Sequence, residues 1–390
     1  MNCDPEFAAT ACSPDDDCEA RRDWFGKTTQ IEHQMGLLSV YLPCSDRQIA
    51  ESSSTLATTD YDALLIVSFG GPEGPDEVMP FLENVVRGRK VPRNRLLAVA
   101  EHYQHFGGIS PLNAQNRQLA AALQKELDAK GPKLRVYLGN RNWHPFLADT
   151  LRQMHSDRVE HSLAFFTSAF SSYSSCRQYL ENIAAARDEV GSGAPTVDKL
   201  RAYFNHPGFI EAMTDRAQTA MAEIPLDRRN DAQLVFTAHS IPLSMAVGCQ
   251  YEAQLREASR LVAASLDHKS WQLAFQSRSG PPTQPWLEPD INDTLRTLAA
   301  SRTRDAVVAP IGFVSDHMEV VYDLDTEAMQ NAKSFGMNMV RAKTVGTHPR
   351  FVQMIRELIL ERTAGGPRLI VGDLPPSPDI CPADCCPSGR

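Results

Sequence analysis

Eight short apolar runs recur along this chain, and amphipathic stretches lie between them. Stretches such as 118–127, 255–266 and 290–300 carry apolar residues at helical spacing. Strands that alternate with helices build parallel sheets through right-handed crossovers. The runs fall into two sets of four around a helical stretch at 209–224, which predicts an α/β protein with two similar doubly wound, Rossmann-like domains, each with a four-stranded parallel sheet. The eight predicted strands are 63–67, 134–138, 163–166, 200–203, 234–236, 271–275, 306–309 and 337–340.

The same pattern suggests where the domains begin and end. We interpret residues 1–58 as a largely disordered extension with one short helix near 31–42, because they show no sustained periodicity. The first domain is expected at 59–225 and the second at 226–345. A helix at 346–364 is expected to pack back on the first domain, and a cysteine-containing tail follows at 365–390.

Charge and hydropathy exclude several classes of protein. The net charge of -9 argues against a nucleic-acid partner, which would select for a basic surface. No apolar run approaches the length of a transmembrane helix. The acidic start of the chain lacks the basic and apolar regions of a signal peptide, and acidic residues are unusual in transit peptides. We therefore expect a cytoplasmic enzyme without a transmembrane segment.

In doubly wound sheets, ligands bind beyond the carboxyl ends of the strands, and two ionisable residues occur there. His239 directly follows the fifth apolar run, and Glu319 lies shortly after the seventh. A histidine in this position can equally cap its strand by hydrogen bonding, and a lone glutamate can be a solvated helix residue. No glycine turn matches a Walker A loop or a complete dinucleotide motif, so a nucleotide enzyme is poorly supported.

Glu319 begins a series of carboxylates spaced four residues apart. Glu319, Asp323 and Glu327 would lie along one face of a helix. Like charges at that spacing destabilise a helix, and no lysine or arginine occurs between 316 and 330 to relieve them. The series therefore favours a role in binding or conducting cations, against the alternative of a solvated acidic face.

Five motifs in this order resemble the ferrochelatase family over residues 61 to about 362. The closest likeness is to the actinobacterial branch, which metallates coproporphyrin III. Segments 139–143 and 173–179 look like that branch's versions. The resemblance implies a chelatase-type fold with the porphyrin cleft between the two domains. The five motifs are Ser68-Phe69-Gly70-Gly71-Pro72, Gly107-Gly108-Ile109-Ser110-Pro111-Leu112, Thr237-Ala238-His239-Ser240-Ile241-Pro242, Gln276-Ser277-Arg278 with Pro285-Trp286-Leu287, and Gly312-Phe313-Val314-Ser315-Asp316-His317-Met318-Glu319.

By this resemblance, His239 and Glu319 form the metal-insertion site. Imidazole and carboxylate both suit a ferrous ion, and an imidazole with a pKa of about 6.5 can also accept a pyrrole proton. We favour His239 as proton acceptor and transient ligand, and Glu319 as ligand and proton outlet. Asp323 and Glu327 are expected to carry hydrated cations from the surface to this pair.

The resemblance also implies residues that hold the porphyrin. Ser110 and Tyr179 are expected to donate hydrogen bonds to propionates, and Arg87 lies in a basic run where guanidinium groups can pair with carboxylates. Phe69, with Phe313 and Trp286, is expected to form apolar walls, although each of these rings could equally be core. Some coproporphyrin enzymes have tyrosine where this chain has Phe69, so a potential axial iron ligand is missing here.

Three of the nine cysteines crowd into the Pro-rich tail, which could not pack a core. Some ferrochelatases, including actinobacterial ones, hold a 2Fe–2S cluster with three tail cysteines and one in the body, and such a cluster needs four ligands. Here the matching residues are Cys176, Cys381, Cys385 and Cys386. Adjacent Cys385 and Cys386 would require a strained or unusual geometry. The alternative is an oxidation-prone tail without a cluster.

The sequence therefore predicts an enzyme that inserts Fe²⁺ into coproporphyrin III to give Fe-coproporphyrin III in haem biosynthesis. Its expected partners are the porphyrin, ferrous iron and other haem-pathway enzymes. The alternatives are a protoporphyrin IX ferrochelatase, a cobalt or nickel tetrapyrrole chelatase, and a non-enzymatic haem or iron-sulfur sensor on a chelatase fold. The cobalt and nickel relatives commonly use paired histidines, whereas this chain offers one strand-end histidine and a series of carboxylates.

Overall fold

The computed structural model describes residues 61–281 and 283–389. The expected extension at 1–58 and its short helix near 31–42 lie outside the described residues. In the described part of the chain, no helix is both long and apolar enough to cross a membrane.

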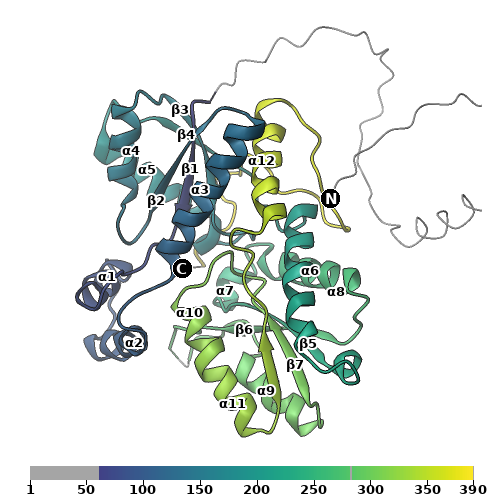
Figure 1. Ribbon diagram of the computed structural model, residues 1–390. Helices are drawn as coiled ribbons and strands as arrows, with labels where there is room; N and C mark the ends of the chain where they lie inside the picture. The colour runs from purple at the N-terminus through teal and green to yellow at the C-terminus, as the bar shows by residue number, and fades with distance from the viewer. Residues whose placement is uncertain (1–60, 282, 390) are drawn as a thin grey trace, which may run out of the picture. The chain divides into compact units, whose positions relative to one another are not determined.

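The first sheet has four parallel strands in the order β2-β1-β3-β4 (Figure 1). The central strand β1 is buried on both faces, as expected for a parallel strand that helices cover from two sides. This explains why its sequence reads as one apolar run. The strands are β1 (Ala63–Ser68), β2 (Arg135–Asn140), β3 (His161–Phe166) and β4 (Thr196–Lys199).

The second sheet repeats this arrangement, with four parallel strands in the order β6-β5-β7-β8. Two four-stranded parallel sheets confirm the predicted α/β fold class. The strands are β5 (Gln233–His239), β6 (Trp271–Gln276), β7 (Asp305–Ala309) and β8 (Asn338–Arg341).

One predicted strand was misplaced. The apolar run at 200–203 was expected to be the fourth strand, but β4 occupies Thr196–Lys199 and the run follows it as irregular, buried chain. β4 pairs only with β3, at the edge of the sheet, and only its last residue, Lys199, is buried. An edge strand needs less apolar surface than a central one, so its sequence does not stand out.

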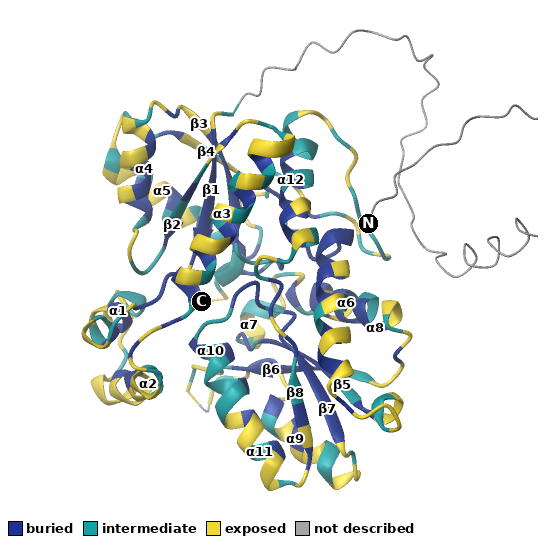
Figure 2. Ribbon diagram, viewed as in Figure 1, coloured by how far each residue is buried: buried dark blue, intermediate teal, exposed yellow. Residues whose placement is uncertain are grey.

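The helices cover the sheets and expose their outer faces (Figure 2). Side-chain caps fix several starting points. The His206 ring accepts from the Gly208 amide at the start of α6, and Asp290 accepts from the Asn292 amide at the start of α9. The helices are α1 (Val78–Val85), α2 (Arg93–His105), α3 (Leu112–Lys130), α4 (Leu147–Ser156), α5 (Gln178–Val190), α6 (Pro207–Ala222), α7 (Leu243–Ala246), α8 (Tyr251–Ser265), α9 (Ile291–Ala300), α10 (Met318–Val321), α11 (Met329–Ser334) and α12 (Pro349–Thr363), with 3₁₀ turns at Pro75–Glu77 and Arg229–Asp231 and π-helical segments at Tyr173–Arg177 and Asp323–Ala328.

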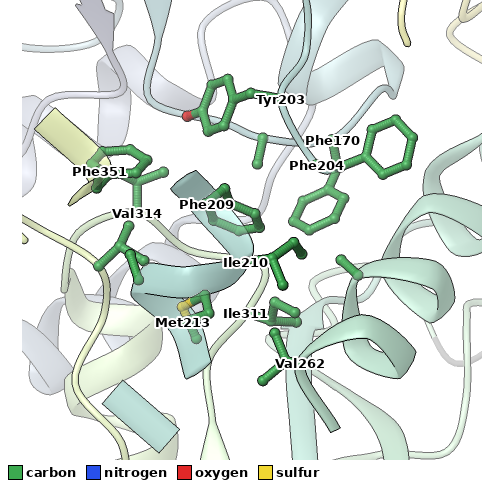
Figure 3. Close-up of a cluster of buried hydrophobic side chains, with 14 of the residues drawn as sticks. Phe170, Tyr203, Phe204, Phe209, Ile210, Met213, Val262, Ile311, Val314 and Phe351 are labelled. Atoms are coloured by element: carbon green, nitrogen blue, oxygen red, sulfur yellow. The ribbon is translucent and has the colours of Figure 1, made fainter. Parts of the chain in front are cut away.

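A shared apolar core joins the two sheets, which belong to one unit of the chain. Phe351 of α12 lies between them, with its ring centroid 5.9 Å from that of Tyr203 and 6.4 Å from that of Phe209 (Figure 3). α12 packs against both α3 and α6. Helices α1 and α2 instead form a pair with a small core of their own around Phe81.

Candidate functional site

His239 and Glu319 meet beyond the carboxyl ends of two neighbouring strands. His239 is the last residue of β5, and Glu319 lies in the first turn of α10, which follows β7. The Nε2 atom of His239 is 3.4 Å from Oε1 of Glu319. The two side chains remain 30% and 44% exposed, so solvent and ligands can reach the pair.

Polar contacts also fix the other ring nitrogen and the backbone carbonyl of His239. Nδ1 contacts the carbonyl oxygen of Ser240, which directs Nε2 towards Glu319. The hydroxyl of buried Tyr251 donates to the carbonyl oxygen of His239 at 3.0 Å. The imidazole therefore presents one nitrogen to the site.

The contact between His239 and Glu319 shifts the pKa of both side chains from their ordinary values. Burial lowers the pKa of His239, but the charge and hydrogen bond of Glu319, with smaller contributions from Ser240 and Asp323, raise it to about 9. Burial raises the pKa of Glu319, and the opposing charge and hydrogen bond of His239 lower it to about 2. These shifts favour imidazolium and carboxylate at neutral pH, whereas acceptance of a pyrrole proton requires the neutral imidazole.

Glu319, Asp323 and Glu327 form a series that runs from the pair towards the surface. Glu327 is exposed, whereas Asp323 is partly buried. Burial raises the pKa of Asp323 to about 7, and the charges of Glu319 and Glu327 act in the same direction against the hydrogen bond from Ser277. These mutual effects place the three carboxylates near one another.

The helix that carries this series is not regular. α10 ends at Val321, and a π-helical segment follows at Asp323–Ala328. The amide of Glu327 accordingly donates to the carbonyl of Tyr322, five residues back, at 3.0 Å. The expected continuous α-helical face was therefore wrong in detail, and π-helical segments are frequent at functional sites.

Several residues around the acids were not predicted. His317 caps α10, since its Nδ1 accepts from the Glu319 amide at 3.2 Å. Tyr103 of α2 is partly buried, and its pKa is raised by burial and by the charges of Glu319 and Asp323. The ring of His102 stacks on Tyr322 at 3.7 Å. The motif around His317 was the only sequence signal, because α2 is distant in the chain.

In the described part of the chain, no three His, Cys, Asp or Glu side chains already stand in the geometry of a single-ion site.

The predicted porphyrin residues separate into two groups. Phe69 and Tyr179 line a cavity of about 60 Å³ together with Phe313 and His317, so residues of both sheets contribute to it. Arg141, which was given no role from the sequence, lies over the rings of Tyr179 and Phe69 at 4.5 and 5.8 Å.

The other group does not line this cavity. Ser110 is buried, and its Oγ lies 3.4 Å from the Leu112 amide that donates to it. Arg87 is exposed on the loop after α1. Trp286 is buried and pairs with Pro242 in an isolated bridge, so it belongs to the core.

A larger hollow of about 420 Å³, beside β8, includes neither His239 nor Glu319.

The four predicted cluster cysteines come together, although they lie far apart in the sequence. The thiols of Cys176 and Cys381, and those of Cys381 and Cys385, lie near enough to shift one another's pKa. The Sγ atoms of Cys385 and Cys386 are 3.5 Å apart. Cys386 has φ +54°, a backbone conformation that residues other than glycine rarely adopt.

Two cations fix the tail against the first sheet. Lys199 donates to the Pro378 carbonyl at 2.7 Å, and Arg177 donates to the Cys385 carbonyl at 3.0 Å. The hydrogen bond from Cys176, reinforced by the charge of Lys199, lowers the pKa of Cys381 to about 5 against the effect of burial. The site thus combines four thiols with two positive charges.

Comparisons with known proteins find close relatives over most of this chain. The ferrochelatase family profile matches residues 61–363. A ferrochelatase of Rhodopirellula baltica is 58% identical over 328 residues, which cover 84% of this chain and 93% of that protein. Coproporphyrin III ferrochelatases of Frankia alni and Streptomyces griseus are 53% and 50% identical, over 83% and 84% of this chain and 86% and 94% of theirs.

Proposed function

The chain belongs to the ferrochelatase family, and from this premise we propose that it inserts Fe²⁺ into coproporphyrin III to give Fe-coproporphyrin III in haem biosynthesis. The observation that carries the proposal is the His239–Glu319 pair at the strand ends, with Nε2 and Oε1 3.4 Å apart. The relatives named coproporphyrin III ferrochelatases support the choice of porphyrin.

Metallation replaces two pyrrole protons with one ferrous ion. Fe²⁺ that reaches the carboxylate of Glu319 opposes the attraction that holds the proton on His239, so the pKa of His239 falls and its Nε2 becomes free. That nitrogen then binds the ion transiently or accepts a pyrrole proton. Glu319 acts as the second ligand and as the outlet through which protons leave the site.

Protons and charge balance in this scheme. The proton first held by His239 passes to solvent as Fe²⁺ arrives; the porphyrin then releases two protons, the ion enters its four nitrogens, and Fe²⁺ keeps its oxidation state. His239 handles one proton at a time because it has one free nitrogen. Its fixed Nδ1 contact keeps that nitrogen aimed at the reacting centre.

Asp323 and Glu327 would carry the hydrated ion from the surface to Glu319. We expect the double substitution Asp323→Asn and Glu327→Gln to raise the apparent KM for Fe²⁺ about tenfold, while the KM for porphyrin stays nearly constant; tenfold corresponds to about 1.4 kcal/mol of lost attraction. Steady-state kinetics under anaerobic conditions measure both constants. Unchanged iron dependence would show that these carboxylates are only surface charge.

A matched control removes two negative charges elsewhere. Asp188 and Glu189 are exposed on α5, and Asp188→Asn with Glu189→Gln should leave both constants unchanged. The wild-type enzyme offers a second check. Since the pKa of Asp323 is raised to about 7, this carboxyl loses its charge as pH falls below 7. The KM for iron should therefore rise as pH falls from about 8 to 6.

The porphyrin would lie between the two sheets, against Phe69, Tyr179 and Phe313. The cavity there, about 60 Å³, is far smaller than the roughly 300–1,000 Å³ typical of ligand sites. This cavity can hold only part of the macrocycle, so the porphyrin would extend beyond it. Ser110 and Arg87 would contact the propionates outside this cavity, because neither lines it.

We also propose that Cys176, Cys381, Cys385 and Cys386 hold a 2Fe–2S cluster. Their thiols already form a connected set, and Lys199 and Arg177 would offset the negative charge of four thiolates. A bound cluster would supply a redox-sensitive link between the tail and the first sheet. The four cysteines supply the ligands that such a cluster requires.

Protein purified without oxygen should be coloured and should contain about two irons and two sulfides per chain. Cys176→Ser should lose both the colour and the sulfide, because one of the four ligands is gone. Cys249→Ser is the control: Cys249 lies near the tail, but its thiol donates to the Met245 carbonyl at 3.3 Å. Colourless wild-type protein without sulfide would refute the cluster.

The remaining alternatives can be separated by one set of assays. Anaerobic insertion with coproporphyrin III and protoporphyrin IX, each offered Fe²⁺, Co²⁺ and Ni²⁺, distinguishes the porphyrins and the metals. A protein that binds haem without turnover would be a sensor.

A further inference from the structure

One buried amide joins the two walls of the cavity between the sheets. Ser68, at the end of β1, lines the cavity on one side, and Ser315, in the loop after β7, lines it on the other. Asn116 of α3 lies behind both walls, fully buried and outside the cavity lining. It has no role in the scheme above.

Both ends of the Asn116 amide form hydrogen bonds. Nδ2 donates to Oγ of Ser68 at 2.7 Å, and Oδ1 accepts from Oγ of Ser315 at 3.3 Å. Ser68 also accepts from the hydroxyl of Thr167, which follows β3 and lines the same cavity, at 3.1 Å. These contacts form the Asn116 bridge, a chain of side-chain hydrogen bonds from the ends of β1 and β3 to the loop after β7.

The preceding residue of α3 holds the same loop. Gln115 donates through Nε2 to Oδ2 of Asp316 at 3.3 Å, and its Oε1 accepts from the Asp316 amide at 2.8 Å. Oδ1 of Asp316 accepts instead from Thr344, after β8, at 3.2 Å. Because α3 packs against β2, two consecutive residues of a first-sheet helix fix two consecutive residues of a second-sheet loop.

Packing alone does not require an amide at position 116. A buried amide costs free energy unless its donor and acceptor are both bonded. Leucine, with the same branching at Cγ, would fill this space without that cost. What asparagine adds is direction, because a hydrogen bond holds its two partners at a defined distance and angle.

We propose that Asn116 is a positioning residue for porphyrin binding, which holds the two cavity walls at the spacing that the macrocycle occupies. This inference rests on the proposed function. Asn116 acts through Ser68 and Ser315 rather than by touching the porphyrin. Walls that are fixed before binding need not be ordered during it, so the bridge lowers the free-energy cost of porphyrin capture.

Asn116→Leu removes both hydrogen bonds and keeps the branching of the side chain. We expect the Kd for coproporphyrin III, measured by quenching of porphyrin fluorescence, to rise about tenfold, the scale of a lost buried hydrogen bond. Single-turnover insertion at saturating porphyrin should slow by less than about threefold, as expected when ground-state and transition-state binding are lost equally. Wild-type porphyrin affinity in this variant would overturn the proposal.

A second variant breaks the Asn116 bridge at its other end. Ser315→Ala leaves the bond between Asn116 and Ser68 in place and should raise the Kd for porphyrin in the same direction, so the test stands even if Asn116→Leu does not fold. Wild-type affinity in folded Ser315→Ala protein would likewise contradict the proposal.

The double variant separates positioning from folding. Asn116→Leu leaves the Ser315 hydroxyl without its partner, which costs stability by itself. Adding Ser315→Ala removes that hydroxyl and should recover part of the stability in chemical denaturation, while the Kd for porphyrin stays raised. Affinity that recovers together with stability would show that Asn116 acts only through folding, against the proposal.

Thr150→Val is the matched control, because it also removes a buried hydrogen bond. Thr150 lies on α4, outside the cavity lining, and its hydroxyl donates to the Leu138 carbonyl at 2.9 Å. This variant should leave the Kd for porphyrin unchanged. An equal rise in Kd here would show that any buried polar loss weakens binding, and would refute a specific role for Asn116.

The outcomes also distinguish this inference from the proposed function. Wild-type protein that inserts no iron into either porphyrin would refute the function itself. Active wild-type protein with unaffected Asn116→Leu and Ser315→Ala variants would refute only the role of Asn116.

Discussion

Replacing His239 with alanine is expected to lower the rate of ferrous insertion by about a thousandfold, while porphyrin affinity changes little. Positioned proton transfer contributes roughly 10²–10⁴ to a rate, and His239 also supplies a metal ligand in the proposed scheme. Its ring does not line the cavity between Phe69, Tyr179 and Phe313. The loss should therefore affect kcat much more than porphyrin binding.

Single-turnover insertion without oxygen measures the rate, and quenching of porphyrin fluorescence measures binding. Glu319→Gln should give a comparable loss, because the amide is neither an anionic ligand nor a proton outlet. His161→Ala, at an exposed position at the start of β3, serves as the control. A His239→Ala enzyme within tenfold of the wild-type rate would rule out the assigned role.

Replacing Arg201 with methionine is expected to destabilise the protein by about 3–5 kcal/mol, the usual cost of removing one partner from a buried ion pair. Arg201 is 1% exposed and Glu361 is 6% exposed. The guanidinium donates to both carboxylate oxygens of Glu361, at 2.8 and 3.0 Å, and to the carbonyl of Leu369 at 2.9 Å. These bonds join the end of β4 to α12 and the chain beyond it.

Without Arg201, the carboxylate of Glu361 would remain buried. The remaining cation beside it would be the partly exposed Arg368, whose Nε is 3.6 Å from Oε1 of Glu361. The double variant Arg201→Met with Glu361→Gln should recover much of the loss, because no buried charge is left unpaired. Chemical denaturation of the three proteins measures these differences. A loss below about 1 kcal/mol in the single variant would contradict the expectation.

An exposed pair provides the comparison. Arg296 and Asp293 lie on the surface of α9 with their side chains more than half exposed. Because solvent screens such pairs, Arg296→Met should change stability by less than about 1 kcal/mol.

The sequence by itself determined the two parallel sheets. A central strand is buried on both faces, so nearly all of its residues are apolar and it appears in the sequence as an apolar run. His239 and Glu319 were identifiable for the same reason, since each follows such a run and ligand sites lie beyond strand ends. The edge strand β4 was misplaced because an edge strand carries little apolar signal. The family motifs then supplied the chemistry that spacing alone left open.

Only the tertiary structure decided how these residues behave. The protonation of His239 depends on the distance to Glu319, and electrostatic energy is set by separation in space rather than in sequence. The contact between Ser277 and Asp323 and the meeting of Cys176 with the tail thiols likewise join distant segments. Local periodicity encodes which surfaces are buried, whereas the pairing of polar atoms emerges only when the segments pack together.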